Sequence, residues 1–146
     1  MRISTKGRYA LAAVTAIART TEDSISLSQL STSLGISKLY LEQVFSLLRK
    51  GGLVSSIKGP HGGYKCTSTP SKLTIWQVVS SVENGLLDPT EPTVPDSAPD
   101  IELGLKTVVF TPLDDAVRGF LESITVQDLL DASDAQRSEQ AYMQNM

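Results

Sequence analysis

Several of the side chains that could carry chemistry gather in one short stretch, residues 56–65, with the sequence SIKGPHGGYK. It holds the only histidine of the chain, His61, among three glycines, and the only cysteine, Cys66, follows directly. A phosphate-binding loop, a plain hairpin and a DNA-contacting wing all have this composition. The glycines do not fit the G-x-x-x-x-G-K-[ST] pattern, and a strand-like run follows them in place of a helix. The stretch is therefore not a nucleotide-binding loop.

Catalytic and metal-binding patterns are scarce elsewhere. His61 has no serine or carboxylate placed nearby in sequence to orient it, and the pair Asp114-Asp115 is two sequence neighbours, not a converging acid and base. A single cysteine excludes an intrachain disulfide framework and a multi-cysteine metal site within one subunit. We expect a protein that is not an enzyme and that has no metal and no cofactor of its own.

Charge divides the chain into two unlike halves. Residues 1–72 hold 10 Lys/Arg and 3 Asp/Glu, a balance of +7, whereas residues 73–146 hold 3 and 13, a balance of −10. A basic half within a chain of net charge −3 indicates a polyanionic partner such as double-stranded DNA. Attraction between the two halves is the alternative that charge alone leaves open.

The location of the protein is predicted from what the sequence lacks. No run of about 18 apolar residues is present, so we expect no transmembrane helix and no membrane partner. The first residues, MRISTKGRY, turn polar and basic at once and do not resemble a secretory signal. We expect a cytoplasmic protein.

Three predicted helices precede the glycine stretch. Ser4 caps the first, Ser26 and Gln29 form a capping box for the second, and Ser37 caps the third. Gly35 fits the left-handed end of the second helix, and the short turn that follows gives the helix-turn-helix pattern. The apolar stripe of the third helix is Leu41, Val44, Phe45 and Leu48.

The third helix carries side chains suited to a DNA major groove. Gln43 has the geometry for a bidentate contact with adenine, and Leu39 for a contact with a thymine methyl. Cations that suit phosphates lie at both ends of the helix: Lys38, Arg49 and Lys50. The alternative is that these are ordinary surface residues of a small helical domain.

Residues 53–57 and 64–67 read as two strands around the glycines. Lys58 and Lys65 flank a narrow tip, which suits a wing that approaches the backbone or the minor groove. His61 at that tip is predicted to meet phosphate or solvent, with a role as a pH sensor the less favoured alternative.

The second half is predicted to hold further helices around a loop. Thr74 caps a fourth helix, and proline-rich acidic residues form a loop over 84–100. Residues 101–110 form a helix or an extended segment, and Thr111 then caps a strong helix with Pro112 in its first turn. Thr125 with Asp128 caps a last, short helix, and the polar tail from 133 to 146 shows no convincing pattern.

The helix after Thr111 carries a continuous apolar stripe: Leu113, Ala116, Val117, Phe120, Leu121 and Ile124. Such a stripe folds back on the first domain or pairs with its copy in a second subunit. We favour a homodimer, because symmetric dimers are the commonest oligomers and suit palindromic sites.

These patterns predict a mainly α fold with a small β-hairpin: a winged helix-turn-helix domain plus a long C-terminal dimerisation helix. The expected organisation is a DNA-binding domain over 1–83, the loop over 84–100, dimerisation helices over 101–132 and a polar tail over 133–146.

Three segments also carry a family resemblance: MRISTKGRYAL, GISKLYLEQVFSLLRKGGLVSSIKGPHGGY and FLESITVQDLLD. They closely resemble the Rrf-two family of bacterial winged-helix transcription regulators. The resemblance implies a homodimer that binds a palindromic operator through the third helix, the wing and the start of the first helix. It also implies that Ser37, Tyr40 and Gln43 meet bases, that Lys58 meets the minor groove, and that Glu42 influences which sequences are accepted.

The chain departs from its resembled relatives at several positions. Leu39 stands where the iron–sulfur cluster regulator of the family has a small polar residue, and His61 where a glycine is usual. Cluster-binding members place three cysteines in the loop after the fourth helix, whereas residues 82–110 here have none. The nitric-oxide-sensitive branch uses an acidic ligand near the start of the first helix, which Lys6-Gly7-Arg8 does not supply. Cys66 is interpreted as a small packed hydrophobe, with a redox switch as the alternative.

The sequence thus predicts a DNA-binding transcriptional repressor that is a cluster-free member of this family. The closing SEQAYM is similar to the tail of the cysteine-metabolism repressor, which responds through a biosynthetic enzyme. A metabolic enzyme or a small-molecule effector is therefore a further possible partner. The alternative function is a winged-helix adaptor that binds an enzyme in place of DNA.

The predicted DNA-contacting residues are Arg2, Ser4, Lys6, Ser37, Lys38, Leu39, Tyr40, Glu42, Gln43, Arg49, Lys50, Lys58, Gly59, His61, Gly62, Gly63 and Tyr64.

Overall fold

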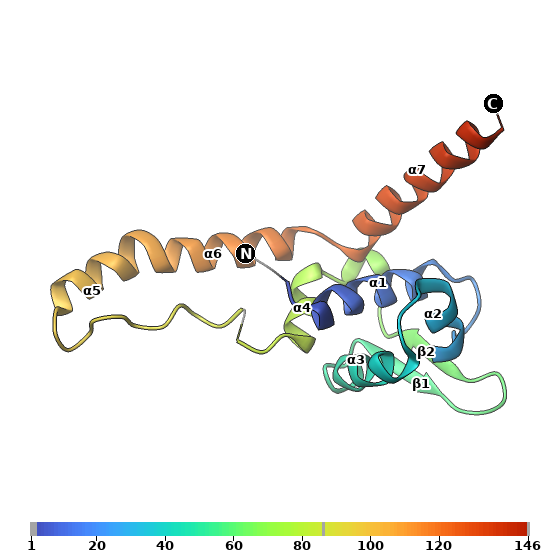
Figure 1. Ribbon diagram of the computed structural model, residues 1–146, viewed down its shortest axis with the longest axis horizontal. Helices are drawn as coiled ribbons and strands as arrows, with labels where there is room; N and C mark the ends of the chain where they lie inside the picture. The colour runs from blue at the N-terminus through green and yellow to red at the C-terminus, as the bar shows by residue number, and fades with distance from the viewer. Residues whose placement is uncertain (1–2, 86, 146) are drawn as a thin grey trace.

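The first three helices begin at the serines that the sequence marks as caps. The computed structural model, which describes residues 3–85 and 87–145 (Figure 1), contains α1 (Thr5–Arg19), α2 (Leu27–Leu34) and α3 (Lys38–Lys50). The hydroxyls of Ser4, Ser26 and Ser37 each accept a backbone N–H of the first turn, and Gln29 completes the capping box of α2. Gly35 ends α2 at φ 68°, so three residues join the two helices of the helix-turn-helix.

A two-stranded hairpin follows α3 and completes the winged fold. Strands β1 (Val54–Ile57) and β2 (Gly63–Cys66) pair antiparallel, with Ser56 opposite Tyr64. Ile25, which precedes α2, adds a bridge to this sheet, with backbone N–O distances to Tyr64 of 3.0 and 2.8 Å. The bridge fixes the hairpin against the helix-turn-helix.

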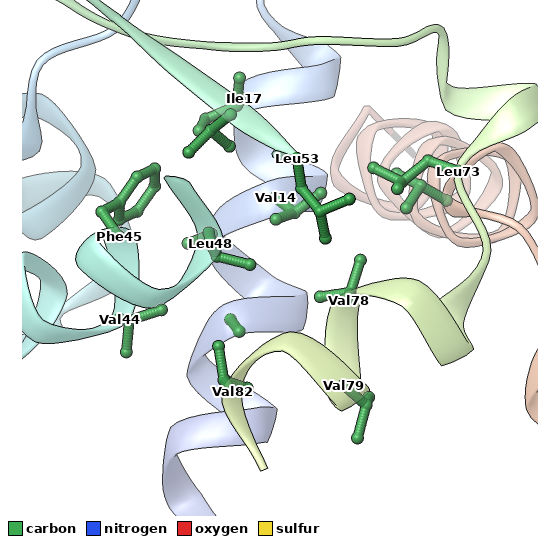
Figure 2. Close-up of a cluster of buried hydrophobic side chains, with 14 of the residues drawn as sticks. Val14, Ile17, Val44, Phe45, Leu48, Leu53, Leu73, Val78, Val79 and Val82 are labelled. Carbon is green, nitrogen blue, oxygen red and sulfur yellow. The ribbon is translucent and has the colours of Figure 1, made fainter. Parts of the chain in front are cut away.

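The core lies between α1, α3 and α4 (Ile75–Val82), and the predicted stripe of α3 is buried in it. Ile75, Val78, Val79 and Val82 of α4 are buried there too. Figure 2 shows side chains of the three helices pointing toward one another. Each fully buried Val, Leu or Phe contributes about 1.5–3 kcal/mol relative to exposure. The labelled members of the cluster are Val14, Ile17, Val44, Phe45, Leu48, Leu53, Leu73, Val78, Val79 and Val82.

Helix α4 is capped as predicted and connects the core to the second half. Thr74 and Gln77 form a capping box, preceded by a short 3-10 turn η1 (Pro70–Lys72). Trp76 is half-buried, and the Arg118 guanidinium lies 4.7 Å from its ring centroid. This contact joins α4 to the long helix described next.

Residues 99–123 form one continuous helix, drawn as a rod in Figure 1. It consists of α5 (Pro99–Leu105), a π-helical stretch η2 (Lys106–Phe110) and α6 (Thr111–Ser123). The loop thus ends at residue 98 and the segment 101–110 is helical. The prediction that Thr111 caps a new helix is wrong, because both Phe110 and Thr111 have helical backbone angles.

The π-helical stretch accounts for a helix that passes through Pro112. Proline has no N–H for the carbonyl four residues back, and its ring pushes against that carbonyl. Immediately before it, the Thr111 N–H donates to the carbonyl of Lys106, five residues back. A widened turn of this kind lets the chain continue past the proline as a helix.

The last helix, α7 (Val126–Gln144), is much longer than the short helix predicted. Its start is as expected, since Thr125 and Asp128 form a capping box. Val126 and Leu130 are buried, but residues 134–145 are exposed and the helix projects from the body of the protein in Figure 1. The apolar periodicity stops after Leu130, so only the helix-forming composition of residues 135–144 signals the extension.

The apolar stripe of α6 divides between two environments. Leu121 is buried, and Val117 and Ile124 are half-buried against the core of the domain. Leu113, Ala116 and Phe120 are exposed. Fold-back and an exposed surface therefore both occur, on adjoining parts of one apolar stripe. Within residues 3–85 and 87–145, none of the helices has the length and hydropathy of a membrane span.

Candidate nucleic-acid interface

Helix α3 presents a polar outer face opposite its buried one. Leu39, Glu42, Gln43 and Ser46 follow the i, i+3, i+4, i+7 spacing of one helix face, and all four are exposed. We call these four residues the outer stripe. Arg49 and Lys50 are exposed in the last turn and continue it. The arrangement is that of a helix buried on one side and free to enter a groove on the other.

The N-terminal end of α3 is held in place by its cap and by a pair of tyrosines. The Ser37 hydroxyl accepts the N–H of Tyr40 at 3.1 Å, and Lys38 beside it is exposed. The Tyr40 ring packs edge-to-face on Tyr9 of α1, with centroids 5.0 Å apart. Tyr40 is half-buried, so its ring supports the helix while part of the side chain remains accessible.

The start of α1 lies next to the outer stripe. The side chains of Lys6, Leu39, Glu42 and Gln43 line one shallow hollow together with Ser46 and Leu47. The predicted contacts of the first and third helices therefore form one surface. Arg2, also predicted to contact DNA, lies outside the residues that the structure describes.

Ser4 has a partner that the sequence does not reveal. Its N–H and its hydroxyl both donate to Glu83 Oε1, at 2.9 and 2.6 Å, while the hydroxyl accepts the Gly7 N–H. Glu83 directly follows α4 and is 79 residues away in sequence. A Cβ at position 7 would collide with this carboxylate, so glycine permits the approach. Ser4 gives up its bond to Glu83 if its hydroxyl is to donate to a phosphate.

The wing tip is a tight turn with one lysine, Lys58, at its start. Lys58 and His61 are exposed, and the Gly62 N–H donates to the Gly59 carbonyl at 2.9 Å. Gly59 has φ 112°, a conformation that side chains with a Cβ rarely adopt. The Ser24 hydroxyl donates to the His61 carbonyl at 3.1 Å and ties the tip to the loop after α1.

That loop brings two carboxylates close to the wing tip. Glu22 and Asp23 line a shallow hollow together with Lys58, Pro60 and His61. The two carboxylates oppose phosphate and partly offset the positive charge of Lys58, which lines the same hollow. The sequence gives no sign of this neighbourhood.

Other residues of the hairpin serve its packing. The Tyr64 ring lies 4.7 Å from the ring of Phe45, and the Gly63 backbone lies so close to Ile25 that a Cβ there would collide with it. Cys66 is half-buried, and burial raises the pKa of its thiol to about 11. A thiol of such pKa is protonated near neutral pH, which agrees with the interpretation of a packed residue.

Comparison with known proteins assigns this architecture. Residues 3–132 match the model of the Rrf2 family, described as an iron-dependent transcriptional regulator. The chain belongs to the Rrf2 family. This is the Rrf-two family whose motifs the sequence resembles, and a winged helix-turn-helix is the fold of its members.

Three relatives align with almost the full length of this Rrf2 chain. The HTH-type transcriptional regulator IscR of Cronobacter sakazakii is 36% identical over 95% of this chain and 90% of its own. The structure of CymR, the global cysteine regulator of B. subtilis, is 34% identical with a TM-score of 0.73, covering 90% of this chain and 98% of its own. The T. potens IscR structure is 30% identical with a TM-score of 0.72, covering 93% and 91%.

Iron in the family description raises the question of ligands in this Rrf2 protein. Iron–sulfur clusters are held mainly by cysteine thiolates, and this chain has one cysteine, on the wing. In the described part of the chain, no three His, Cys, Asp or Glu side chains converge as a metal site. Along the loop, Glu102 accepts the N–H groups of Thr93 and Val94, and Asp114 accepts from Thr90. These residues do not fit a cysteine-held cluster.

Proposed function

We propose that this protein is a cytoplasmic, sequence-specific DNA-binding repressor that binds a palindromic operator as a homodimer, without an iron–sulfur cluster and without enzymatic activity. The observation that carries the proposal is the outer stripe of α3, which lies against Lys6 and continues into Arg49 and Lys50. A capped helix with such a face suits base readout in the major groove, with cations for the flanking phosphates.

The wing supplies a second contact in this proposal. Figure 1 shows α3 and the hairpin on the side of the domain that faces away from α7. Lys58 at the tip and Lys65 on β2 are both exposed. A narrow, glycine-rich tip with a lysine reaches the backbone or the minor groove next to the groove that α3 occupies.

Support for the homodimer comes from the exposed apolar side chains on the rod of residues 99–123. A monomer that left this surface in water would expose an unusually large apolar area. A second copy of the chain covers this apolar surface symmetrically. The dimer then presents two α3 helices related by a two-fold axis, and two such helices match the two half-sites of a palindrome. The exposed large residues on the rod are Ile101, Leu103, Val108, Val109, Leu113 and Phe120.

DNA binding is tested with fragments from upstream of genes in the source genome, at a stated salt concentration. We expect protection of specific sites, and a loss of about fivefold to 150-fold in affinity in Gln43→Ala, because a good bidentate base contact contributes about 1–3 kcal/mol. Protection no better than that on scrambled DNA would reject the proposal. Transcription in vitro from a protected promoter should fall when the protein is added.

The dimer is tested by sedimentation of two variants with matched exposure. Phe120 on α6 is 64% exposed and Met143 on α7 is 65% exposed. We expect Phe120→Glu to sediment as a folded monomer, because it places a charge in the paired face, and Met143→Glu to remain dimeric. Equal sedimentation of the wild type and Phe120→Glu would contradict pairing through this helix.

The cluster-free state has a separate check. Anaerobic purification should give a colourless protein whose operator affinity does not change on exposure to air. A brown protein with visible charge-transfer absorption would overturn this part of the proposal and would require ligands from two subunits or from side chains other than cysteine.

A winged-helix adaptor for a metabolic enzyme is the second candidate function. The exposed end of α7, which carries Tyr142 and Met143, is the observation that favours it. Changing Tyr40 and Gln43 to alanine separates the two. If the protein is a repressor, the wild type should bind DNA specifically and the variant should lose this binding. If it is an adaptor, the wild type should show no specific DNA binding and the variant should still bind the enzyme.

A further inference from the structure

An aliphatic side chain stands at the N-terminal end of the outer stripe. Leu39 is 68% exposed, whereas the other three members of the stripe are polar. Leu41 and Phe45, which lie on the opposite face of α3, are fully buried. Leu39 is therefore not part of the domain core. Packing within the domain does not account for an aliphatic side chain at this position.

The position of Leu39 limits what it can contact in a DNA complex. It is the second residue of α3, and the N-terminal residues of the second helix of a helix-turn-helix reach base edges. Its side chain has neither a donor nor an acceptor. The group that an aliphatic side chain recognises in the major groove is the methyl of thymine.

The neighbours of Leu39 complete the reading surface. Gln43 lies one helical turn further along the same face, and both side chains line the hollow that Lys6 borders. Gln43 can form a bidentate pair with adenine, while Lys6 holds a nearby phosphate. One apolar and one amide side chain in this order suit adjacent A·T base pairs.

We propose that Leu39 is a specificity-determining residue that recognises the methyl group of one thymine in each half-site, next to the base pair read by Gln43. This inference rests on the proposed function, because it assigns a base contact within the same interface. It predicts an operator preference that differs from that of proteins with a polar residue at this position.

The test removes the methyl alone. A duplex is first selected from a random-sequence pool by the full-length wild-type protein, and each thymine is then replaced singly by deoxyuridine. We expect about fourfold to tenfold weaker binding at one thymine per half-site and no change at the others, since one buried methyl accounts for that much. Leu39→Ala should bind the thymine duplex more weakly by a similar factor and should not distinguish the two bases.

Two variants control for side effects of the substitution. Leu39→Met keeps an apolar side chain of similar size and should keep the thymine preference. Tyr142→Ala alters a residue of equal exposure, 68%, on α7 and should change neither the affinity nor the preference. Thermal unfolding of each variant verifies the fold.

Equal binding of the thymine and deoxyuridine duplexes by the wild type at every position would overturn the inference and leave the repressor intact. Retention of the full thymine preference by Leu39→Ala would also overturn it, because another residue would then read the methyl. Failure to select any sequence from the pool would instead reject the proposed function, and the inference with it.

Discussion

Two phenylalanines show how differently the halves of the chain use apolar side chains. Phe45 on α3 is fully buried, packed against Tyr64 and the core of the winged helix. Phe120 on α6 points into solvent with 64% of its surface exposed. Both belong to regular apolar stripes in the sequence, and the pattern alone does not distinguish them.

The exposure of the two side chains distinguishes a domain that buries its apolar residues in its own core from a helix that leaves part of its apolar stripe uncovered. The first half closes around side chains from α1, α3 and α4, shown in Figure 2. The rod of residues 99–123 packs on the domain through its C-terminal part, with Val117, Arg118 and Leu121, and its α5 end extends beside the loop (Figure 1). The basic half thus closes its own core, and the acidic half leaves an apolar surface exposed on the rod.

Phe45→Ala should have the largest effect on stability. Removing a buried phenylalanine loses transfer free energy and leaves a cavity, at a cost of about 3–5 kcal/mol in the free energy of unfolding. The measurement is urea unfolding followed by circular dichroism at a fixed protein concentration. A loss of this size is a large share of the roughly 5–15 kcal/mol by which folded proteins are stable.

Phe120→Ala is the matched change in the other half. At a protein concentration low enough to dissociate a dimer, it should cost less than about 1 kcal/mol, as exposed substitutions do. The cost should grow as the concentration rises and the wild type associates. Equal losses for the two variants at low concentration would remove the contrast between the halves.

Thr125 and Thr111, both in the second half of the chain, differ in whether a helix begins at them. Thr125 accepts the Asp128 N–H at 3.2 Å and begins α7, whereas Thr111 lies inside the continuous helix. Thr125→Ala should lower the free energy of unfolding by about 1 kcal/mol, the usual effect of losing an N-cap. Urea unfolding at matched concentration measures this loss.

Thr111→Ala should be neutral or slightly stabilising, because alanine is the better residue within a helix. A loss near 1 kcal/mol for Thr111→Ala would mean that a helix does begin there, as the sequence pattern indicates. No loss for Thr125→Ala would show that packing of Leu130, and not the cap, fixes the start of α7.

These threonines also show how far the sequence alone leads. Side-chain caps are local, so Ser4, Ser26, Ser37 and Thr74 predict helix starts that the structure confirms. Thr111-Pro112 has the same signature and misleads, because a π-helical turn lets the helix pass through the proline. The extension of α7 lacks an apolar period, so the sequence pattern does not predict it.

The candidate site also has features that a local sequence pattern predicts and features that only the fold reveals. The outer stripe follows from the helical period once the buried stripe of α3 is known, and the structure places Lys6 beside it. The bonds from Ser4 to Glu83 and the acids Glu22 and Asp23 near the wing tip come from chain crossings that no local pattern encodes. They could be found only from the fold.

Lys58→Ala tests whether the basic half contacts DNA through its wing. Each lost phosphate contact should reduce the slope of log affinity against log salt by about 0.9 and weaken binding to all sequences alike. Arg137→Ala, which removes an exposed cation on α7, is the control and should leave the slope unchanged. An unchanged slope in Lys58→Ala would place the wing away from the backbone.

The smallest effect concerns the contact between the loop and the rod in the acidic half. The Thr90 N–H donates to Asp114 Oδ2 at 2.9 Å and its hydroxyl donates to Oδ1 at 2.7 Å. The backbone bond, and then the hydroxyl bond, lower the pKa of the Asp114 carboxyl below its usual value near 3.8. Because the folded pKa is the lower one, this contact stabilises the loop above the unfolded pKa and is lost as pH falls through the folded pKa.

We therefore expect the loop to detach from α6 only in acid, below about pH 4, and to remain attached at neutral pH. An NMR titration of the Asp114 carboxyl carbon, with the Thr90 amide as a second probe, measures the pKa directly. Thr90→Val removes the hydroxyl and keeps the N–H, so the pKa should rise part of the way toward its ordinary value. A full return in Thr90→Val would show that the hydroxyl alone holds the carboxylate. An ordinary pKa in the wild type would show that the loop does not rest on the rod in solution, and the acidic half would then offer an even larger free surface.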